Sequence, residues 1–269
     1  MSLPKPGPDR TAVVTGASSG IGEEIARELA RRGHGVTLVA RREDKLAALA
    51  AELGDSAHVL AADLSKRSDR AALLGRIEAL GLTPDILVNN AGLSTLGPVA
   101  ASDPEAELNM IEVDVASVVD LCSRFLPGMT SRRRGAILNV ASTAAFQPLP
   151  GQAGYGACKA FVLSYTQSLT GELNGTGVTA TALCPGPVDT GFGEAAGFSK
   201  EDAEAALPSV MWMPADVVAK TGVDGMAKGR MVAIPGTVNR VASVFAAVTP
   251  RKLLVPILAR NHPGLRRGR

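Results

Sequence analysis

The sequence predicts an α/β protein built on a doubly wound, mostly parallel sheet of seven strands, with helices on both faces. Short β-branched runs alternate with longer helical patterns along most of the 269 residues, an order typical of βαβ units. The apolar fraction of 46% suits a globular protein with a large core. The chain has no internal repeat and no low-complexity linker, so we expect one main domain.

The expected strands are Thr11–Thr15, Gly35–Ala40, Ala57–Ala61, Ile86–Asn89, Ala136–Ala141, Val178–Leu183 and Met231–Ile234. The helical patterns between them are Ile21–Arg32, Glu43–Leu53, Arg67–Ala79, Pro104–Met129, Tyr155–Asn174 and Ala215–Lys228. The first helix shows the periodicity most clearly, because Ile21, Ile25 and Leu29 recur every four residues and charged residues mark the opposite side. Gly33 follows this helix as a stop signal.

The composition argues against several classes of protein. A formal net charge of +2 is too small to indicate a nucleic acid partner, and we expect the arginine runs at 132–134 and 266–269 to be solvated. The three cysteines lie far apart without a C-x-x-C pair, which indicates neither a disulfide framework nor a metal site. No apolar run is long enough to span a bilayer, and the N-terminus lacks the apolar segment of a signal peptide. We therefore expect a cytoplasmic protein.

A glycine-rich turn, Thr15-Gly16-Ala17-Ser18-Ser19-Gly20-Ile21-Gly22, follows the first strand and leads into the first helix. Gly16 can take the tight turn, Gly20 lets the backbone approach a pyrophosphate, and Gly22 lets helix and strand pack closely. The start of the helix offers free N–H groups to phosphates. The turn therefore predicts a dinucleotide site, with contacts from Gly16, Ser18, Ser19, Gly20, Ile21 and Gly22.

Three motifs in this order resemble those of the short-chain dehydrogenase/reductase family. They are the T-G-x-x-x-G-x-G turn, Asn89-Asn90-Ala91-Gly92 after a strand, and Tyr155-Gly156-Ala157-Cys158-Lys159. The resemblance covers residues from about 10 to about 235 and implies a Rossmann fold. It also implies a small-molecule carbonyl or alcohol substrate and assembly into a homodimer or homotetramer.

NADP(H) is the expected cofactor, in preference to NAD(H). The second strand ends in Ala40, and Arg41 and Arg42 follow it. An acidic residue at this strand tip would bind the ribose 2′-hydroxyl, whereas an arginine binds a 2′-phosphate. We expect Arg41 to be the ligand. The alternative is that both arginines are solvated residues at the start of a helix.

Tyr155 and Lys159 are the expected chemical centre. Carbonyl reduction needs a hydride, which a nicotinamide supplies, and an acid that protonates the developing alkoxide. The ordinary pKa of tyrosine is about 10, and the ammonium of Lys159, one helical turn away, can stabilise the phenolate. By the resemblance, Ser142 at the end of the fifth strand orients the substrate carbonyl, with Thr143 as its nearest competitor.

The sequence departs from the family's pattern at Asp114. The resemblance implies an asparagine at this position, where it supports a proton relay to the lysine. A carboxylate here either holds Lys159 in place or traps its ammonium and weakens its effect on Tyr155. We include Asp114 among the catalytic residues with Ser142, Tyr155 and Lys159.

The resemblance also implies further cofactor contacts. The loop after the sixth strand is expected to lie against the nicotinamide, and the glycine-punctuated stretch 191–197 forms either a mobile lid or a disordered loop. Tyr155 and Lys159 are expected to contact the cofactor as well. The remaining contacts are Asp63 and Leu64 at the adenine, Asn90 along the adenosine, and Pro185, Gly186, Val188 and Thr190 at the nicotinamide.

We expect a flexible N-terminus over residues 1–9, a dinucleotide-binding catalytic domain over 10–235, and a C-terminal helical extension over 236–269. The extension carries Val238, Val241, Val244, Phe245 and Val248 at helical spacing. Our first interpretation is a helix that packs over the substrate cleft or across a subunit interface. The alternative is a helix that lies on a membrane surface.

Two other functions stay open at this point. One is a regulator that binds NADP(H) without turnover, and the other is epimerase-type chemistry on the same scaffold. The presence of Ser142, Tyr155 and Lys159 together favours an oxidoreductase. The substrate and the direction of the reaction are open among 3-oxoacyl groups, sterols and xenobiotic ketones.

Overall fold

A seven-stranded parallel sheet forms the centre of the structure, a computed structural model that describes residues 3–195, 197 and 208–266. The strand order is β3-β2-β1-β4-β5-β6-β7, and every neighbouring pair is parallel. The strands are β1 (Arg10–Thr15), β2 (Gly35–Ala40), β3 (Ala57–Ala61), β4 (Thr83–Asn89), β5 (Gly135–Val140), β6 (Val178–Leu183) and β7 (Val232–Ala233). The predicted doubly wound sheet is confirmed. Its strand order reverses between β1 and β4, where open α/β sheets bind their ligands.

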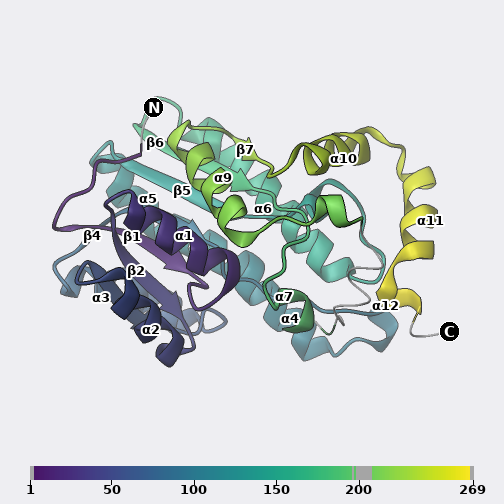
Figure 1. The fold of residues 1–269 in the computed structure, drawn as a ribbon, viewed down its shortest axis with the longest axis horizontal. Coiled ribbons are helices and arrows are strands. Elements are labelled where there is room, and N and C mark those ends of the chain that lie inside the picture. The colour runs from purple at the N-terminus through teal and green to yellow at the C-terminus, as the bar shows by residue number, and fades with distance from the viewer. Residues whose placement is uncertain (1–2, 196, 198–207, 267–269) are drawn as a thin grey trace.

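Helices cover both faces of this sheet (Figure 1). One face carries α1 (Gly20–Arg31), α2 (Glu43–Leu53) and α9 (Ala215–Ala227), and the other carries α3 (Arg67–Ala79), α5 (Ser117–Ser131) and α6 (Ala153–Glu172). Ile25, Leu46 and Val218 belong to the buried cluster on the first face. Leu73, Phe125 and Val162 belong to that on the second. Each fully buried side chain of this kind contributes about 1.5–3 kcal/mol, so the clusters hold the helices on the sheet.

The helix expected over 104–129 is interrupted. The structure has α4 (Pro104–Ile111) and α5, joined by a π-helical turn at Glu112–Ala116. A π turn takes up more residues than an α turn, and neither glycine nor proline marks it in the sequence. The turn matters for the site because it contains Asp114, which is buried.

Four strands differ from their predicted bounds. β1 begins one residue earlier, at Arg10, and β5 is shifted by one residue to Gly135–Val140. β4 begins at Thr83, because Thr83 and Pro84 pair with Arg10 and Thr11 of β1. β7 is limited to Val232 and Ala233. Short 3-10 turns lie at Val99–Ala101, Thr143–Phe146 and Ser209–Met211, and a short helix, α7, spans Phe192–Ala195.

Three helices follow the sheet: α10 (Thr237–Val248), α11 (Arg251–Asn261) and α12 (Pro263–Arg266). They lie at the end of the molecule opposite α2 and α3 (Figure 1). The helical spacing of the valines after residue 236 is therefore confirmed as a helix. Among the described residues, no helix is both long enough and apolar enough to cross a membrane.

Candidate active site

The glycine-rich turn joins β1 to α1 at the carboxyl end of the sheet. Gly16 and Gly20 have φ angles of 65° and 60°, in the left-handed region that glycine tolerates best. A side chain at Gly22 would meet the amide of Asn90 and the carbonyl of Gly16, so this glycine allows the predicted close packing of helix on strand. Ile21 packs against the core beside it. The N–H groups at the start of α1 are thus available to a phosphate.

The loop after β6 approaches this turn. A Cβ atom on Gly20 would lie only 2.8 Å from Cβ of Thr190, so the two segments are in direct contact. Farther back in the loop, Val188 forms a parallel bridge with Met213. The segment with the predicted phosphate contacts and the segment with the predicted nicotinamide contacts therefore lie side by side.

The start of the same loop is fixed from two sides. The carbonyl of Pro185 accepts a hydrogen bond from the N–H of Thr143 (2.8 Å), which joins the loop to the end of β5. Gly186 lies against Asn239 of α10, since a side chain on this glycine would overlap the Asn239 amide. The C-terminal extension therefore supports the loop that the sequence assigns to the nicotinamide.

The two arginines after β2 have different surroundings. The Arg42 guanidinium donates hydrogen bonds to the hydroxyls of Ser18 (2.9 Å) and Ser19 (2.8 Å) and to the Ser18 carbonyl (3.2 Å). Arg41 is exposed, and its positive charge helps to lower the pKa of Asp63. Arg41 was the expected ligand, whereas the contacts of Arg42 with the turn were not expected. The only sequence signal for Arg42 was its place beside Arg41.

The residues assigned to the adenosine side lie at the ends of β3 and β4. Asp63 accepts hydrogen bonds from the N–H (3.1 Å) and the hydroxyl (2.8 Å) of Ser65. Burial opposes the charge of Asp63, but these bonds keep the pKa of its carboxyl below the ordinary value. Leu64 is buried in the core. The Asn90 amide donates to the carbonyl of Thr15 (3.0 Å) and so holds the glycine-rich turn against β4.

Tyr155 and Lys159 lie on α6, with Ser142 just beyond the end of β5. Lys159 Nζ is 5.5 Å from the centre of the Tyr155 ring, and it also donates to the carbonyl of Val140 (3.3 Å). The Ser142 hydroxyl is close enough to Tyr155 to help lower its pKa, and it accepts a hydrogen bond from the N–H of Ala144 (3.1 Å). Ser142 therefore both caps a turn and contacts the tyrosine, and the structure brings the predicted three residues together.

Asp114 completes this cluster from the π-helical turn. Its Oδ2 lies 2.9 Å from Lys159 Nζ, and its Oδ1 accepts the N–H of Leu93 (2.7 Å). Both residues are buried, since Asp114 is 1% exposed and Lys159 is 5% exposed. Gly92 provides the space, since a Cβ there would lie 3.2 Å from both charged groups.

The charges of the cluster act on one another. Burial alone would lower the pKa of Lys159, but attraction from Asp114 and Tyr155 raises it above its ordinary value. Burial raises the pKa of Asp114, and the Lys159 ammonium opposes this rise. Although part of Tyr155 is exposed, burial also raises its pKa, while Lys159 and Ser142 pull it down and Asp114 pushes it up. Lys159 thus lowers the pKa of Tyr155 as expected, but the rise that burial causes is larger.

Sequence reasoning missed three residues near this cluster. The ring of Phe192 lies 5.9 Å from that of Tyr155, and no motif marked it. The Gln152 amide donates to the Ser94 hydroxyl (2.7 Å), and its oxygen lies 3.2 Å from Nε2 of His262. His262, between α11 and α12, thereby connects the C-terminal extension to the loop just before Tyr155. The expected lid over 191–197 lies partly outside the described residues.

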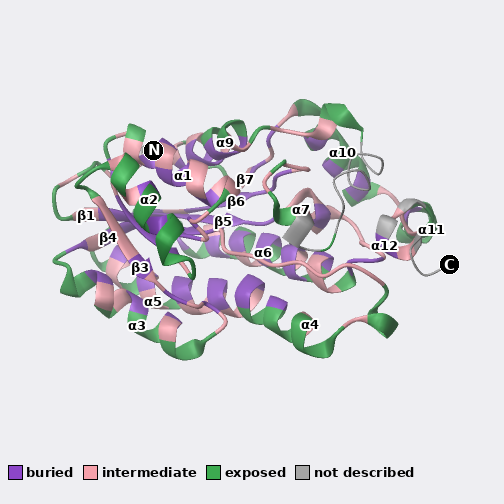
Figure 2. Ribbon diagram, turned by 60° about the horizontal axis from the view of Figure 1, so that its bottom comes forward, coloured by how far each residue is buried: buried purple, intermediate pink, exposed green. Residues whose placement is uncertain are grey.

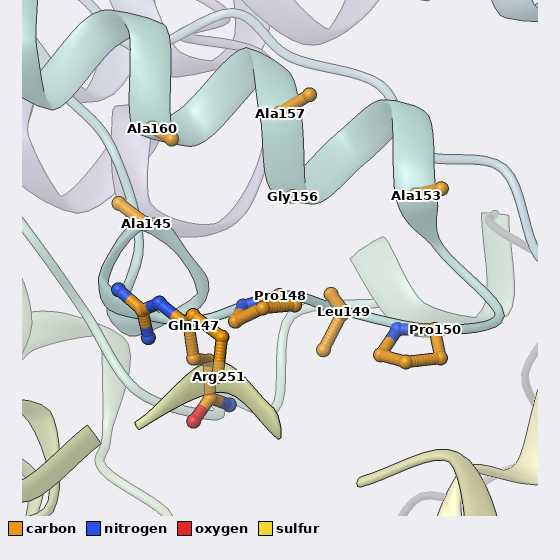
Figure 3. Close-up of a pocket in the computed structure, with 10 residues that line it drawn as sticks. All are labelled: Ala145, Gln147, Pro148, Leu149, Pro150, Ala153, Gly156, Ala157, Ala160 and Arg251. Atoms are coloured by element: carbon orange, nitrogen blue, oxygen red, sulfur yellow. The ribbon is translucent and has the colours of Figure 1, made fainter. Parts of the chain in front are cut away.

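A pocket of about 470 Å³ lies elsewhere on α6 (Figure 3). Its lining is Ala145, Gln147, Pro148, Leu149, Pro150, Ala153, Gly156, Ala157, Ala160 and Arg251. Of the α6 residues in this lining, Ala153 and Ala157 occupy the side of the helix roughly opposite Tyr155. Neither Tyr155 nor Lys159 lines this pocket.

A family model described as short chain dehydrogenase matches residues 10–200, which is more than half of the chain. Among curated proteins, the NADP-dependent 3-hydroxy acid dehydrogenase YdfG of Escherichia coli is 38% identical over 177 residues, which cover 65% of this chain and 71% of that protein. An uncharacterized oxidoreductase of Staphylococcus epidermidis is 38% identical over 192 residues, which cover 71% of this chain and 84% of that protein.

Solved structures resemble the chain over nearly its whole length. A short-chain dehydrogenase from Sphingobium yanoikuyae in complex with NADPH has a TM-score of 0.78 and 33% identity, covering 92% of this chain and 95% of that one. A 7β-hydroxysteroid dehydrogenase has a TM-score of 0.83 and 25% identity, covering 96% of this chain and 99% of that one.

Proposed function

Since the chain belongs to the short-chain dehydrogenase/reductase family, we propose that it transfers a hydride between NADP(H) and a carbonyl or secondary alcohol, with Tyr155 as general acid and base. Its membership makes it an oxidoreductase acting on a small molecule. The observation that carries the finer proposal is the cluster at the carboxyl end of β5. Ser142 contacts Tyr155 there, and Lys159 stands between Tyr155 and Asp114.

The chemistry of the glycine-rich turn and its neighbours suits a dinucleotide phosphate. The glycine-rich turn has the backbone conformation that lets a pyrophosphate approach the start of α1, and two arginines lie beside it with no acidic residue at the tip of β2. In this proposal Arg41 binds the 2′-phosphate while Arg42 holds Ser18 and Ser19 in position. When bound there, NADPH supplies the hydride. The relatives YdfG, described as NADP-dependent, and the Sphingobium enzyme, solved with NADPH, support this choice.

Proton transfer is the task of the chain's own residues. The raised pKa of Tyr155 keeps its hydroxyl protonated near neutral pH, which is the state that protonates an alkoxide. Lys159 stabilises the phenolate that remains, and Ser142 can donate a hydrogen bond to the substrate oxygen. Relatives named for a 3-hydroxy acid and a 7β-hydroxysteroid support a substrate that carries a hydroxyl or the matching ketone.

Tyr155→Phe tests this role directly. The substitution keeps the ring beside Phe192 but removes the acidic hydroxyl, so we expect NADPH oxidation with a panel of ketones and 3-oxo acids to fall by about 10²–10⁴-fold. NADPH binding, followed by fluorescence, should change little. Equal turnover by both proteins would rule out Tyr155 as the acid, and a wild-type protein that binds NADPH without turning over any carbonyl would favour the regulator instead.

A further inference from the structure

The outer side of α10 is apolar. Val241, Val244, Phe245 and Val248 are between 59% and 74% exposed. Their spacing places them on one side of the helix, and Figure 2 shows the exposed residues of α10 on the surface of the molecule. Contiguous apolar surface of this kind marks contact with a protein or a membrane.

The inner side of α10 is polar or small, which is the reverse of an ordinary surface helix. Asn239 and Ser243 are buried, together with Ala246. The Asn239 amide donates to the carbonyls of Met211 (3.0 Å) and Pro235 (3.2 Å). These contacts fix the rotation of α10, so its apolar side faces outward as part of the fold.

The helix α11, which follows α10, also exposes apolar residues. Leu253 and Ile257, one helical turn apart, are both exposed, and the Arg251 guanidinium ties α11 to the Ala246 carbonyl of α10 (2.9 Å). Figure 1 shows α10 and α11 forming one end of the molecule. We call the exposed residues Val238, Val241, Val244, Phe245, Val248, Leu253 and Ile257 the C-terminal apolar face.

The charged residues of the C-terminal extension all have the same sign. Residues 236–269 contain seven of the 28 basic residues and none of the 26 acidic ones. Residues 1–235 therefore contain 21 basic and 26 acidic residues, a formal net charge of −5 against +7 for the extension. Arg240, Lys252 and Arg260 of this set are exposed on α10 and α11.

This charge decides between two occupants of the face. A symmetric dimer through the face would bring two copies of the same basic segment together, and like charges repel. An anionic lipid surface instead attracts each exposed basic residue. We propose that the C-terminal apolar face docks on the surface of an anionic lipid bilayer, with α10 lying along the interface.

The dimensions of the helices suit this arrangement. α10 has 12 residues and α11 has 11, so each is about 16–18 Å long, whereas the hydrocarbon core of a bilayer is about 30 Å thick. Helices that lie in the interface bury an apolar side among the acyl chains and keep basic side chains at the headgroups. Through His262 and Gln152, the docked end also adjoins the loop before Tyr155.

Vesicle sedimentation with the full-length protein tests the proposal. We expect binding to vesicles of phosphatidylcholine and phosphatidylglycerol at least about tenfold tighter than to phosphatidylcholine alone, and loss of this difference in high salt. Val244→Asp/Phe245→Asp should abolish the binding. The matched control is Leu80→Asp, which changes an exposed apolar residue directly after α3 and should bind as the wild type does.

Two readouts keep the result interpretable. Thermal melting and NADPH binding should be unchanged in the double variant, because both side chains are mostly exposed; if it fails to fold, Lys252→Glu/Arg260→Glu replaces it and should weaken binding about tenfold or more. Tyr155→Phe should bind vesicles like the wild type, so the test is independent of the reaction.

Other outcomes overturn the proposal. One is a wild-type protein that binds both vesicle types equally or not at all. Another is a double variant that still binds, which would place the contact elsewhere. A third is a wild-type protein that does not bind vesicles and sediments as a dimer, together with a double variant that sediments as a monomer. This result would make the face a subunit contact.

Discussion

Replacing Asp114 with asparagine tests what the carboxylate does in the buried cluster. Both of its oxygens are engaged, Oδ1 by the N–H of Leu93 (2.7 Å) and Oδ2 by the Lys159 ammonium (2.9 Å). An amide has one acceptor oxygen, so Asp114→Asn leaves one of these donors facing an NH₂ group. A buried donor without a partner costs about 1–3 kcal/mol. For a chain of this length we expect the melting temperature to fall by about 2–10 °C.

The same substitution should have only a small effect on the reaction rate. Lys159 also donates to the Val140 carbonyl, so its ammonium stays near Tyr155, and we expect kcat/KM to remain within about tenfold of the wild type. The charge of Asp114 helps to raise the pKa of Tyr155. Removing this charge should therefore lower the pKa of Tyr155. Alcohol oxidation needs the deprotonated Tyr155 as a base, so its rate should begin to rise at a lower pH.

The assay is kcat/KM in both directions from about pH 6 to about pH 10, with thermal melting of the same samples. Asp114→Leu is the matched variant: it removes both acceptors and leaves the Lys159 ammonium buried and unpaired, which should cost about 3–5 kcal/mol of stability. A loss of activity well beyond tenfold in Asp114→Asn at unchanged stability would show that the carboxylate has a role of its own. A pH profile that does not move would refute the electrostatic argument.

Three further results are expected. Arg41→Ala should weaken NADPH binding by about ten- to a hundredfold and leave NADH binding unchanged in fluorescence titrations; an equal loss for both would contradict the assignment. Gly22→Ala forces a methyl group against Asn90 and should cost about 1–3 kcal/mol in denaturant unfolding, whereas Gly75→Ala in open space on α3 should not destabilise. Burial lowers the pKa of His262 in the folded protein. The stability that the neutral imidazole gives the folded state is therefore fully present above the unfolded pKa of about 6.5 and is lost as the pH falls below that value, because the unfolded state then binds the proton more readily. Between about pH 7 and about pH 5, the melting temperature of His262→Gln should therefore fall less than that of the wild type. Equal falls in both proteins would show that His262 is not the cause.

Local patterns in the sequence were sufficient to predict most of the fold. The bounds of α2 (Glu43–Leu53) and β6 (Val178–Leu183) are those expected, because hydrophobic periodicity and the flanking glycines act within a few residues. The left-handed conformation of Gly16 follows from the same kind of local chemistry. The spacing of Tyr155 and Lys159 is likewise a helical property, so their proximity needed no tertiary information.

Contacts between distant segments decided the rest. Asp114 reaches Lys159 from a π turn that no residue type marks, and Phe192 reaches Tyr155 from the short helix α7. The sequence by itself determined that Val241 and Phe245 lie on one side of a helix. Only the tertiary structure turned that side outward, because Asn239 on the other side is held by the carbonyl of Met211 from another segment and by that of Pro235 just before the helix.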